Sequence, residues 1–99
     1  MMFRHVVMMK FNDDQNVEII SSEIKQLLEA LVSSVEPLKA MEVGLNVSKK
    51  PSAYHLVLIA DFNDEAGLDA YRSHPDHVKI LDRMKDTVEK VAAVDYFVS

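Results

Sequence analysis

The spacing of hydrophobic and polar positions changes its period several times along the chain. Residues 3–11 alternate between two faces, which predicts a β-strand. From Val17 the hydrophobic residues recur every three or four positions, which predicts an amphipathic helix of about five turns. This helix should end near Pro37, because the residue before a proline avoids the helical conformation. Residues 12–14, "NDD", supply turn and N-cap chemistry between the two elements.

The second half of the chain alternates again. Residues 41–48 and 54–62 predict two strands joined as a hairpin with a tight turn. Two short helices follow, the second opened by Pro75, and residues 91–98 predict a closing strand. The order β-α-β-β-α-β predicts an α+β, ferredoxin-like fold with a four-stranded antiparallel sheet, as a single domain over residues 1–99.

Both faces of the predicted sheet are apolar. Helices cover only one face of such a sheet, so the other face of a monomer should be polar. Left exposed, it would be a large hydrophobic patch on a small protein. We therefore expect it to pack against a second copy of the chain, which makes the protein a homodimer built as a dimeric α+β barrel. The residues assigned to this interface are Val6, Met8, Leu56, Leu58, Val94 and Val98.

Composition excludes several classes of function. The 99 residues are 48% hydrophobic and 27% charged, and the formal net charge of −5 argues against nucleic acid or an anionic membrane as the main partner. Without cysteine there is no thiolate catalysis, and two glycines are too few for a phosphate-binding loop. His74 and His77 lack a third ligand at suitable spacing, so we expect no metal and no cofactor. Without a signal sequence or a membrane-spanning run, we expect a cytoplasmic protein.

The stretch "YRSHPDHVK", residues 71–79, carries candidate chemistry. With Pro75 at the first helical position, His77 lies in the first turn and His74 is the expected cap. The positive end of the helix dipole favours a neutral imidazole, the form that a general base requires. Tyr71 is a candidate hydrogen-bond donor to a carbonyl or enolate oxygen. The structural alternative is that these residues only cap a helix and pack beside it.

His5 alternates with Val7 and Met9 on the strand face assigned to a pocket, so it needs a polar partner. Because the first and third strands are expected to be antiparallel neighbours, Asp61 should lie beside His5. A His5–Asp61 contact would either only stabilise the sheet or form part of a functional site. By the same geometry His55 should lie toward the opposite end of the sheet, at the pocket mouth or on the surface.

Five blocks resemble the stress-responsive A/B barrel (Dabb) domain family, and they occur in the family order. They are "RHVVMMKF", "EVGLNVS", "AYHLVLIADF", "AYRSHPDHVK" and "VAAVDYFV". The resemblance covers nearly the whole chain, and the HPxH tract after a tyrosine is its most specific block. It implies a small homodimeric α+β barrel. Most bacterial members have no established reaction.

A plant branch of the family implies a possible chemistry, because it contains cofactor-free polyketide cyclases with a pocket between sheet and helices. Their histidine–tyrosine pair falls on His77 and Tyr71, and their pocket histidines on the first and third strands fall on His5 and His55. Where these enzymes place bulky aromatic groups on the first helix, this chain has aliphatic residues, Ile24 and Leu28.

Three functional hypotheses follow. The first is a pocket for a small, mostly apolar, carbonyl-bearing molecule, with His77 as base, Tyr71 as oxyanion donor and His5 as the orienting group. The residues expected to bind the ligand are Val7, Met9, Ile24, Leu28, Val57, Asp61 and His55. The second is a stress-related dimeric interaction module without chemistry. The third is a cofactor-free monooxygenase, a class that occurs among related barrel families.

Overall fold

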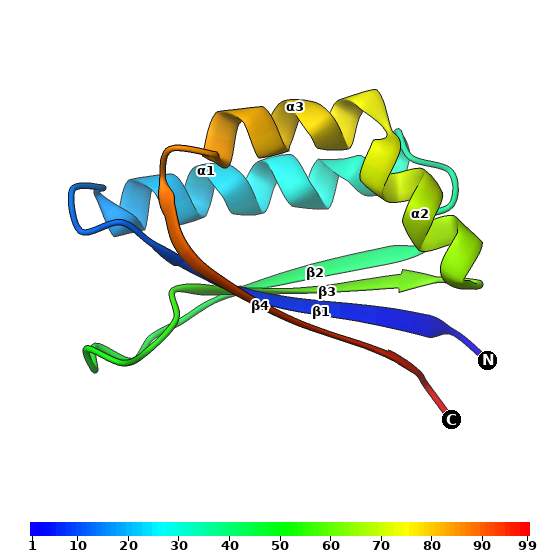
Figure 1. Ribbon diagram of the computed structural model, residues 1–99, viewed down its shortest axis with the longest axis horizontal. Helices are drawn as coiled ribbons and strands as arrows, with labels where there is room; N and C mark the ends of the chain where they lie inside the picture. The colour runs from blue at the N-terminus through cyan, green and yellow to red at the C-terminus, as the bar shows by residue number, and fades with distance from the viewer.

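The four β-strands form one layer and the helices lie together on one side of it (Figure 1). The computed structural model describes residues 1–99. The strands form one antiparallel sheet in the order β2-β3-β1-β4, and the predicted ferredoxin-like β-α-β-β-α-β arrangement is confirmed. No helix has the length and apolar character needed to cross a bilayer. The elements are β1 (Phe3–Phe11), α1 (Val17–Ala30), the 3-10 turn η1 (Leu31–Ser33), β2 (Ala40–Leu45), β3 (Leu56–Phe62), α2 (Glu65–Ser73), α3 (Pro75–Met84) and β4 (Val88–Phe97).

Side-chain hydrogen bonds decide where the helices begin and end. Asn16 caps α1 and Asp64 caps α2, each by accepting a bond from a backbone N–H three residues on, at 3.2 and 2.9 Å. The regular part of α1 ends at Ala30, well before Pro37, so the predicted helix was too long. The Ser33 hydroxyl donates to the Ala30 carbonyl at 2.8 Å, and the chain tightens there into a 3-10 turn.

The connection between β2 and β3 is longer than the predicted tight turn, because residues 46–55 lie outside both strands. The Asn46 side chain accounts for the early end of β2. Its amide nitrogen donates to the Tyr54 carbonyl at 2.6 Å, and its oxygen accepts from the Ser48 N–H at 2.8 Å. Such side-chain bonds compete with the regular ladder for backbone groups, so the segment forms a loop.

The side of β3 that packs under the helices is opposite to the predicted one. In the antiparallel register His5 lies opposite Ala60, so the even-numbered residues of β3 share the helix-facing side of β1. Leu56 and Leu58 are 1% and 5% exposed in the core, and their assignment to a dimer interface was wrong. Val57, expected in the pocket, lies on the opposite side. The helix-facing residues of β3 are Leu56, Leu58, Ala60 and Phe62.

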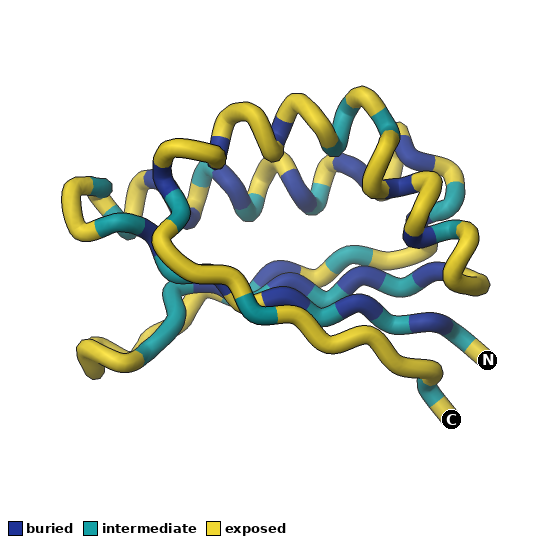
Figure 2. Tube along the Cα trace, viewed as in Figure 1, coloured by how far each residue is buried: buried dark blue, intermediate teal, exposed yellow.

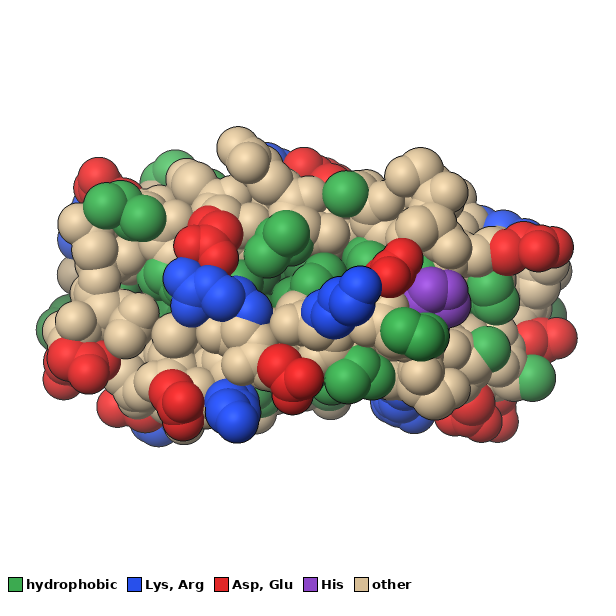
Figure 3. Space-filling model, turned by 90° about the horizontal axis from the view of Figure 1, so that it is seen from above, with side chains coloured by type: hydrophobic (Ala, Val, Ile, Leu, Met, Phe, Trp, Pro, Cys, Tyr) green, Lys and Arg blue, Asp and Glu red, His purple; other side chains and the backbone are tan.

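The sheet face turned away from the helices, here called the outer sheet face, is nevertheless apolar. Its apolar residues lie between Arg4 and Asp61 at one end and Lys10 and Lys90 at the other, and they are Val6, Met8, Val57, Ile59, Ala92 and Val94. Val94 is 63% exposed, Met8 is 41% exposed, and β4 is exposed along most of its length (Figure 2). Val98 follows the end of β4, where its N–H donates to the Met2 carbonyl. The helix side differs, because charged side chains of both signs surround its hydrophobic ones (Figure 3).

Candidate active site

A cavity of about 390 Å³ lies between the sheet and the helices. Ten of its 13 lining residues are hydrophobic, among them Val7, Met9 and Leu28. The other three are His5, Arg72 and His77, and Tyr71, counted among the ten, adds its hydroxyl to these polar groups. The three side chains with predicted acid–base or donor roles therefore line one cavity, and the remaining wall is almost wholly apolar. A largely apolar pocket with a few convergent polar groups is the usual form of a small-molecule site.

The junction between α2 and α3 brings Tyr71 and His77 together. His74 has an extended backbone, ends α2 and caps α3, and its Nδ1 accepts a bond from the Asp76 N–H at 3.1 Å, so the predicted cap is confirmed. Within one continuous helix, residues six apart would point about 120° away from each other and lie about 9 Å apart along the axis. Across the break, the Tyr71 and His77 rings have centroids 4.2 Å apart and tilt by 39°.

Tyr71 is placed to donate a hydrogen bond into the cavity. The residue is 1% exposed, and its ring packs against Phe62 at a centroid distance of 5.2 Å. The hydroxyl has no hydrogen-bond partner within the chain, and its oxygen is not sealed from solvent, so it faces the cavity that the residue lines. Burial raises the pKa of Tyr71 to about 12. The phenol therefore keeps its proton at neutral pH and can donate it in a hydrogen bond to an acceptor oxygen.

His77 presents an unprotonated nitrogen. Its Nδ1 lies 3.1 Å from the Arg72 carbonyl oxygen. Since a carbonyl only accepts, Nδ1 carries the hydrogen and Nε2 keeps a lone pair without a partner in the chain. Burial of the ring lowers the pKa of His77 below its ordinary value of 6.5, although the bond to the Arg72 carbonyl opposes the shift. At neutral pH the ring is therefore a neutral base with a free Nε2.

His5 contacts Asp95 rather than the expected Asp61. The register places His5 beside Asp95 on β4, and Nδ1 lies 2.5 Å from the carboxylate oxygen. Asp61 lies opposite Arg4, whose guanidinium donates two bonds to it, at 2.8 and 3.0 Å. The predicted His5–Asp61 contact and the assignment of Asp61 to the pocket were wrong, because β3 turns its odd-numbered residues outward. A carboxylate at Nδ1 leaves Nε2 of His5 as the nitrogen available to a ligand.

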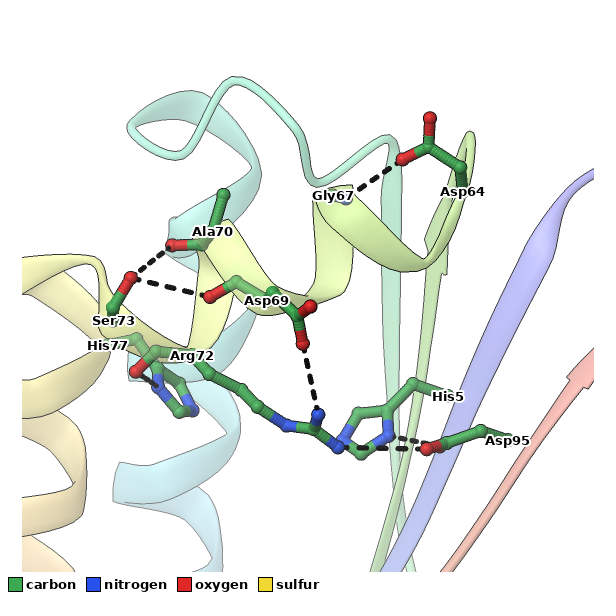
Figure 4. A network of polar contacts seen from close by, with 9 residues as sticks. All are labelled: His5, Asp64, Gly67, Asp69, Ala70, Arg72, Ser73, His77 and Asp95. Carbon is green, nitrogen blue, oxygen red and sulfur yellow. Dashed lines mark hydrogen bonds and ion pairs between the residues drawn. The ribbon is translucent and has the colours of Figure 1, made fainter.

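Arg72 connects both histidines and was missing from the predicted site (Figure 4). Its backbone carbonyl holds His77, and its guanidinium lies 3.6 Å from Asp95 and 3.5 Å from Asp69. The positive charge adds a smaller contribution to the lowered pKa of His77. The sequence offered a sign of each residue. Arg72 is a basic residue directly after Tyr71, and Asp95 is the single acidic residue among apolar ones near the end of β4.

Two further residues expected to bind the ligand lie elsewhere. Ile24 is fully buried in the core between α1 and the sheet and does not line the cavity. His55, which directly precedes β3, lies outside the cavity and was wrongly assigned to ligand binding there. Its Nδ1 accepts a bond from the Phe11 N–H at 2.9 Å, and its ring stacks on that of Phe11. No group of three or more His, Asp or Glu side chains is placed to hold a metal ion.

Known proteins resemble this chain over nearly its whole length. The stress-response A/B barrel domain-containing protein HS1 of Arabidopsis thaliana is 30% identical over 95 residues, which cover 94% of this chain and 86% of HS1. A crystal structure of a dimeric protein of unknown function with a ferredoxin-like fold, from Bacteroides fragilis, superposes with a TM-score of 0.87 and 31% identity, covering 96% of this chain and 94% of that one.

The fold also occurs in an enzyme. The hydroxynitrile lyase of Passiflora edulis superposes with a TM-score of 0.83, covering 99% of this chain and 94% of that one, but at 14% identity it shares only the fold. The family evidence comes from the sequence. The family model of the stress responsive A/B barrel domain matches residues 3–98, and the chain belongs to this family.

Proposed function

We propose that this protein is a homodimer whose cavity between sheet and helices carries out cofactor-free acid–base chemistry on a small, mostly apolar carbonyl compound. One observation carries the proposal. The Tyr71 hydroxyl and His77 Nε2, each without a partner in the chain, belong to touching rings that line the same apolar cavity. An unpartnered donor beside an unpartnered base matches what proton removal next to a carbonyl requires.

The step is a proton transfer. His77 Nε2 takes a proton from the carbon next to the carbonyl, and the electron pair of the broken C–H bond forms the enolate. The negative charge collects on the carbonyl oxygen, where the Tyr71 O–H donates a hydrogen bond. His5, whose Nδ1–H donates to Asp95, presents the lone pair of Nε2 and orients the ligand by accepting a hydrogen bond from a hydroxyl or other donor on it. The apolar wall excludes water, which strengthens each of these interactions.

The homodimer is supported by the outer sheet face. The helices lie on the other side of the sheet and leave its six apolar residues uncovered, and Val94 and Met8 are substantially exposed. A second copy is the occupant that fits, because a two-fold axis pairs this face with an identical apolar face. The similar Bacteroides fragilis protein is described as dimeric. Compared with the interface expected from the sequence, Val57, Ile59 and Ala92 take the places of Leu56, Leu58 and Val98.

Hydrogen–deuterium exchange tests the proposed chemistry without knowledge of the natural substrate. Short aliphatic ketones and β-keto esters are incubated with the protein in D2O, and loss of the α-proton signal is followed by NMR. Tyr71→Phe and His77→Ala should each lower the exchange rate by about 10²-fold. His74→Asn is the matched control, because asparagine also caps a helix and His74 does not line the cavity. Unchanged exchange in the His77→Ala protein would refute the proposed base.

A dimeric interaction module without chemistry remains the second candidate. It is favoured by the outer sheet face, which predicts self-association whatever the cavity does. Under this alternative the protein dimerises, and no compound in the panel exchanges faster than in buffer. A panel compound that binds the cavity and exchanges at a rate dependent on His77 excludes it.

A further inference from the structure

A second hollow of about 390 Å³ lies between the start of α1 and the loop of residues 46–55. It shares no lining residue with the cavity that contains Tyr71 and His77. Only two of its ten lining residues are hydrophobic. We propose that this hollow binds the oxyanion group, phosphate or carboxylate, of a small molecule. The proposal is independent of the chemistry suggested for the other cavity.

Positive charge gathers at the hollow in a chain whose formal net charge is −5. Lys49 and Lys50 both line it, and neither forms an ion pair within the chain. The opposite wall is the first turn and a half of the 14-residue helix α1, where the helix dipole is positive. Glu18 is the one acidic lining residue, so the two lysines leave a net positive charge.

Ser21 supplies the independent sign that something binds here. The residue is 3% exposed and lines the hollow from α1. Its Oγ is the one side-chain oxygen or nitrogen in the chain that is both sealed within the protein and without a hydrogen-bond partner. Buried hydroxyls nearly always have a partner, because leaving one unpaired is costly. Because the residue also lines the hollow, a rotation of its side chain about the Cα–Cβ bond would turn Oγ into the hollow, where a bound anion would supply the missing partner.

His55 adds a donor with a fixed direction. Because its Nδ1 accepts the Phe11 N–H, that nitrogen holds a lone pair and Nε2 carries the hydrogen. Stacking on the Phe11 ring, with 3° between the two planes, holds the imidazole in place. Nε2–H has no partner in the chain, and the residue lines the hollow. Two lysines, an imidazole N–H and a hydroxyl together favour a ligand rich in acceptor oxygens and carrying negative charge.

The test is an NMR titration of the ¹⁵N-labelled full chain with sodium phosphate and, separately, sodium acetate, each against sodium chloride of equal ionic strength. We expect saturable shifts centred on the amides of Ser21, Ser22 and His55. Tighter binding of phosphate identifies a phosphoryl ligand, and tighter binding of acetate identifies a carboxylate; both results support the site. No saturable shift up to anion concentrations on the order of 0.1 M, or the same shifts with chloride, would overturn it.

Variants separate a specific site from general charge attraction. Lys49→Ala with Lys50→Ala should weaken anion binding at least tenfold, whereas Lys85→Ala with Lys90→Ala removes the same charge away from the hollow and should leave affinity within twofold. Glu18→Gln should tighten binding. Ser21→Ala should weaken it severalfold without lowering Tm, since alanine favours the helix and removes an unpaired buried hydroxyl. Equal losses in the two lysine pairs, or unchanged affinity in Ser21→Ala, would refute the site.

Discussion

Val94 offers the sharpest test of dimerisation through the outer sheet face. It lies opposite Val6 in the β1–β4 register and is 63% exposed in the single chain. Val94→Asp should therefore disturb the fold of one chain little. In a two-fold dimer packed through this face, the substitution introduces one carboxylate from each chain into the apolar contact.

The expected loss can be worked out from the burial of Val94. Burying an exposed valine side chain contributes about 1.5–3 kcal/mol. Because Val94 already has part of its surface covered within the chain, dimerisation adds about 1–2 kcal/mol per copy, or about 2–4 kcal/mol per dimer. Removing an unpaired carboxylate from water costs several kcal/mol more, and the two-fold axis applies that cost twice. A total of at least about 4 kcal/mol weakens the dimer by roughly three orders of magnitude.

Sedimentation equilibrium at micromolar concentration measures this effect. We expect a wild-type dimer and a Val94→Asp monomer that keeps its circular dichroism spectrum. Ile19→Asp is the matched control, since Ile19 is 66% exposed on α1, away from the sheet, and the same charge is added there. A monomeric wild-type protein, or a Val94→Asp dimer constant within tenfold of wild type, would refute the interface.

Four other predictions concern the cavity and the core. Because burial lowers the pKa of His77, its neutral form persists below pH 6.5, so the exchange rate should fall with acid only at a midpoint below 6.5; a midpoint above 6.5 contradicts the assignment. The unfolded chain binds that proton more readily, so stability contributed at His77 should also decline as pH falls below 6.5. In urea titrations, the difference in free energy of unfolding between wild type and His77→Ala should be constant above pH 6.5 and shift in favour of the variant below it. Asp95→Asn should lower the exchange rate about tenfold by releasing His5 from its carboxylate, and an unchanged rate would make Asp95 a structural residue only. Ile24→Ala should reduce the free energy of unfolding in urea by about 2–5 kcal/mol, whereas exposed Ile19→Ala should change it by less than about 0.5 kcal/mol, and equal effects would contradict the described core.

The contrast between β1 and β3 shows how far alternation alone can assign a sheet face. In β1, Arg4 and Lys10 mark the solvent side, so the core-facing residues follow from the sequence. In β3 both sets of alternating residues are apolar, and only Asp61 marks the outside. Because Asp61 was expected to contact His5, it was placed on the helix side of the sheet. Successive residues of a strand alternate between faces, so this one assignment put every side chain of β3 on the wrong face.

The site was predictable where it is local and unpredictable where it depends on strand pairing. Tyr71 and His77 are joined by a short segment whose proline and cap residue define two helix ends, so their proximity follows from the sequence. The partner of His5 depends on the register between β1 and β4, which lie at opposite ends of the chain. Asp95 can therefore be identified as the partner of His5 only once the strands are paired. Arg72 is then found as a member of the site because its guanidinium contacts the same carboxylate.

The helix junction at His74 makes the number of residues in this segment as important as their identity. One residue inserted into the last turn of α2, after Tyr71, would turn α3 by about 100° about the axis of α2 and advance it by about 1.5 Å. The His77 ring would then leave the Tyr71 ring, although every side chain of the site would still be present. Side chains between the two residues can therefore change during evolution more freely than the length of the segment. A search for the same site in other chains should accordingly specify the spacing and the proline as strictly as the tyrosine and the histidine.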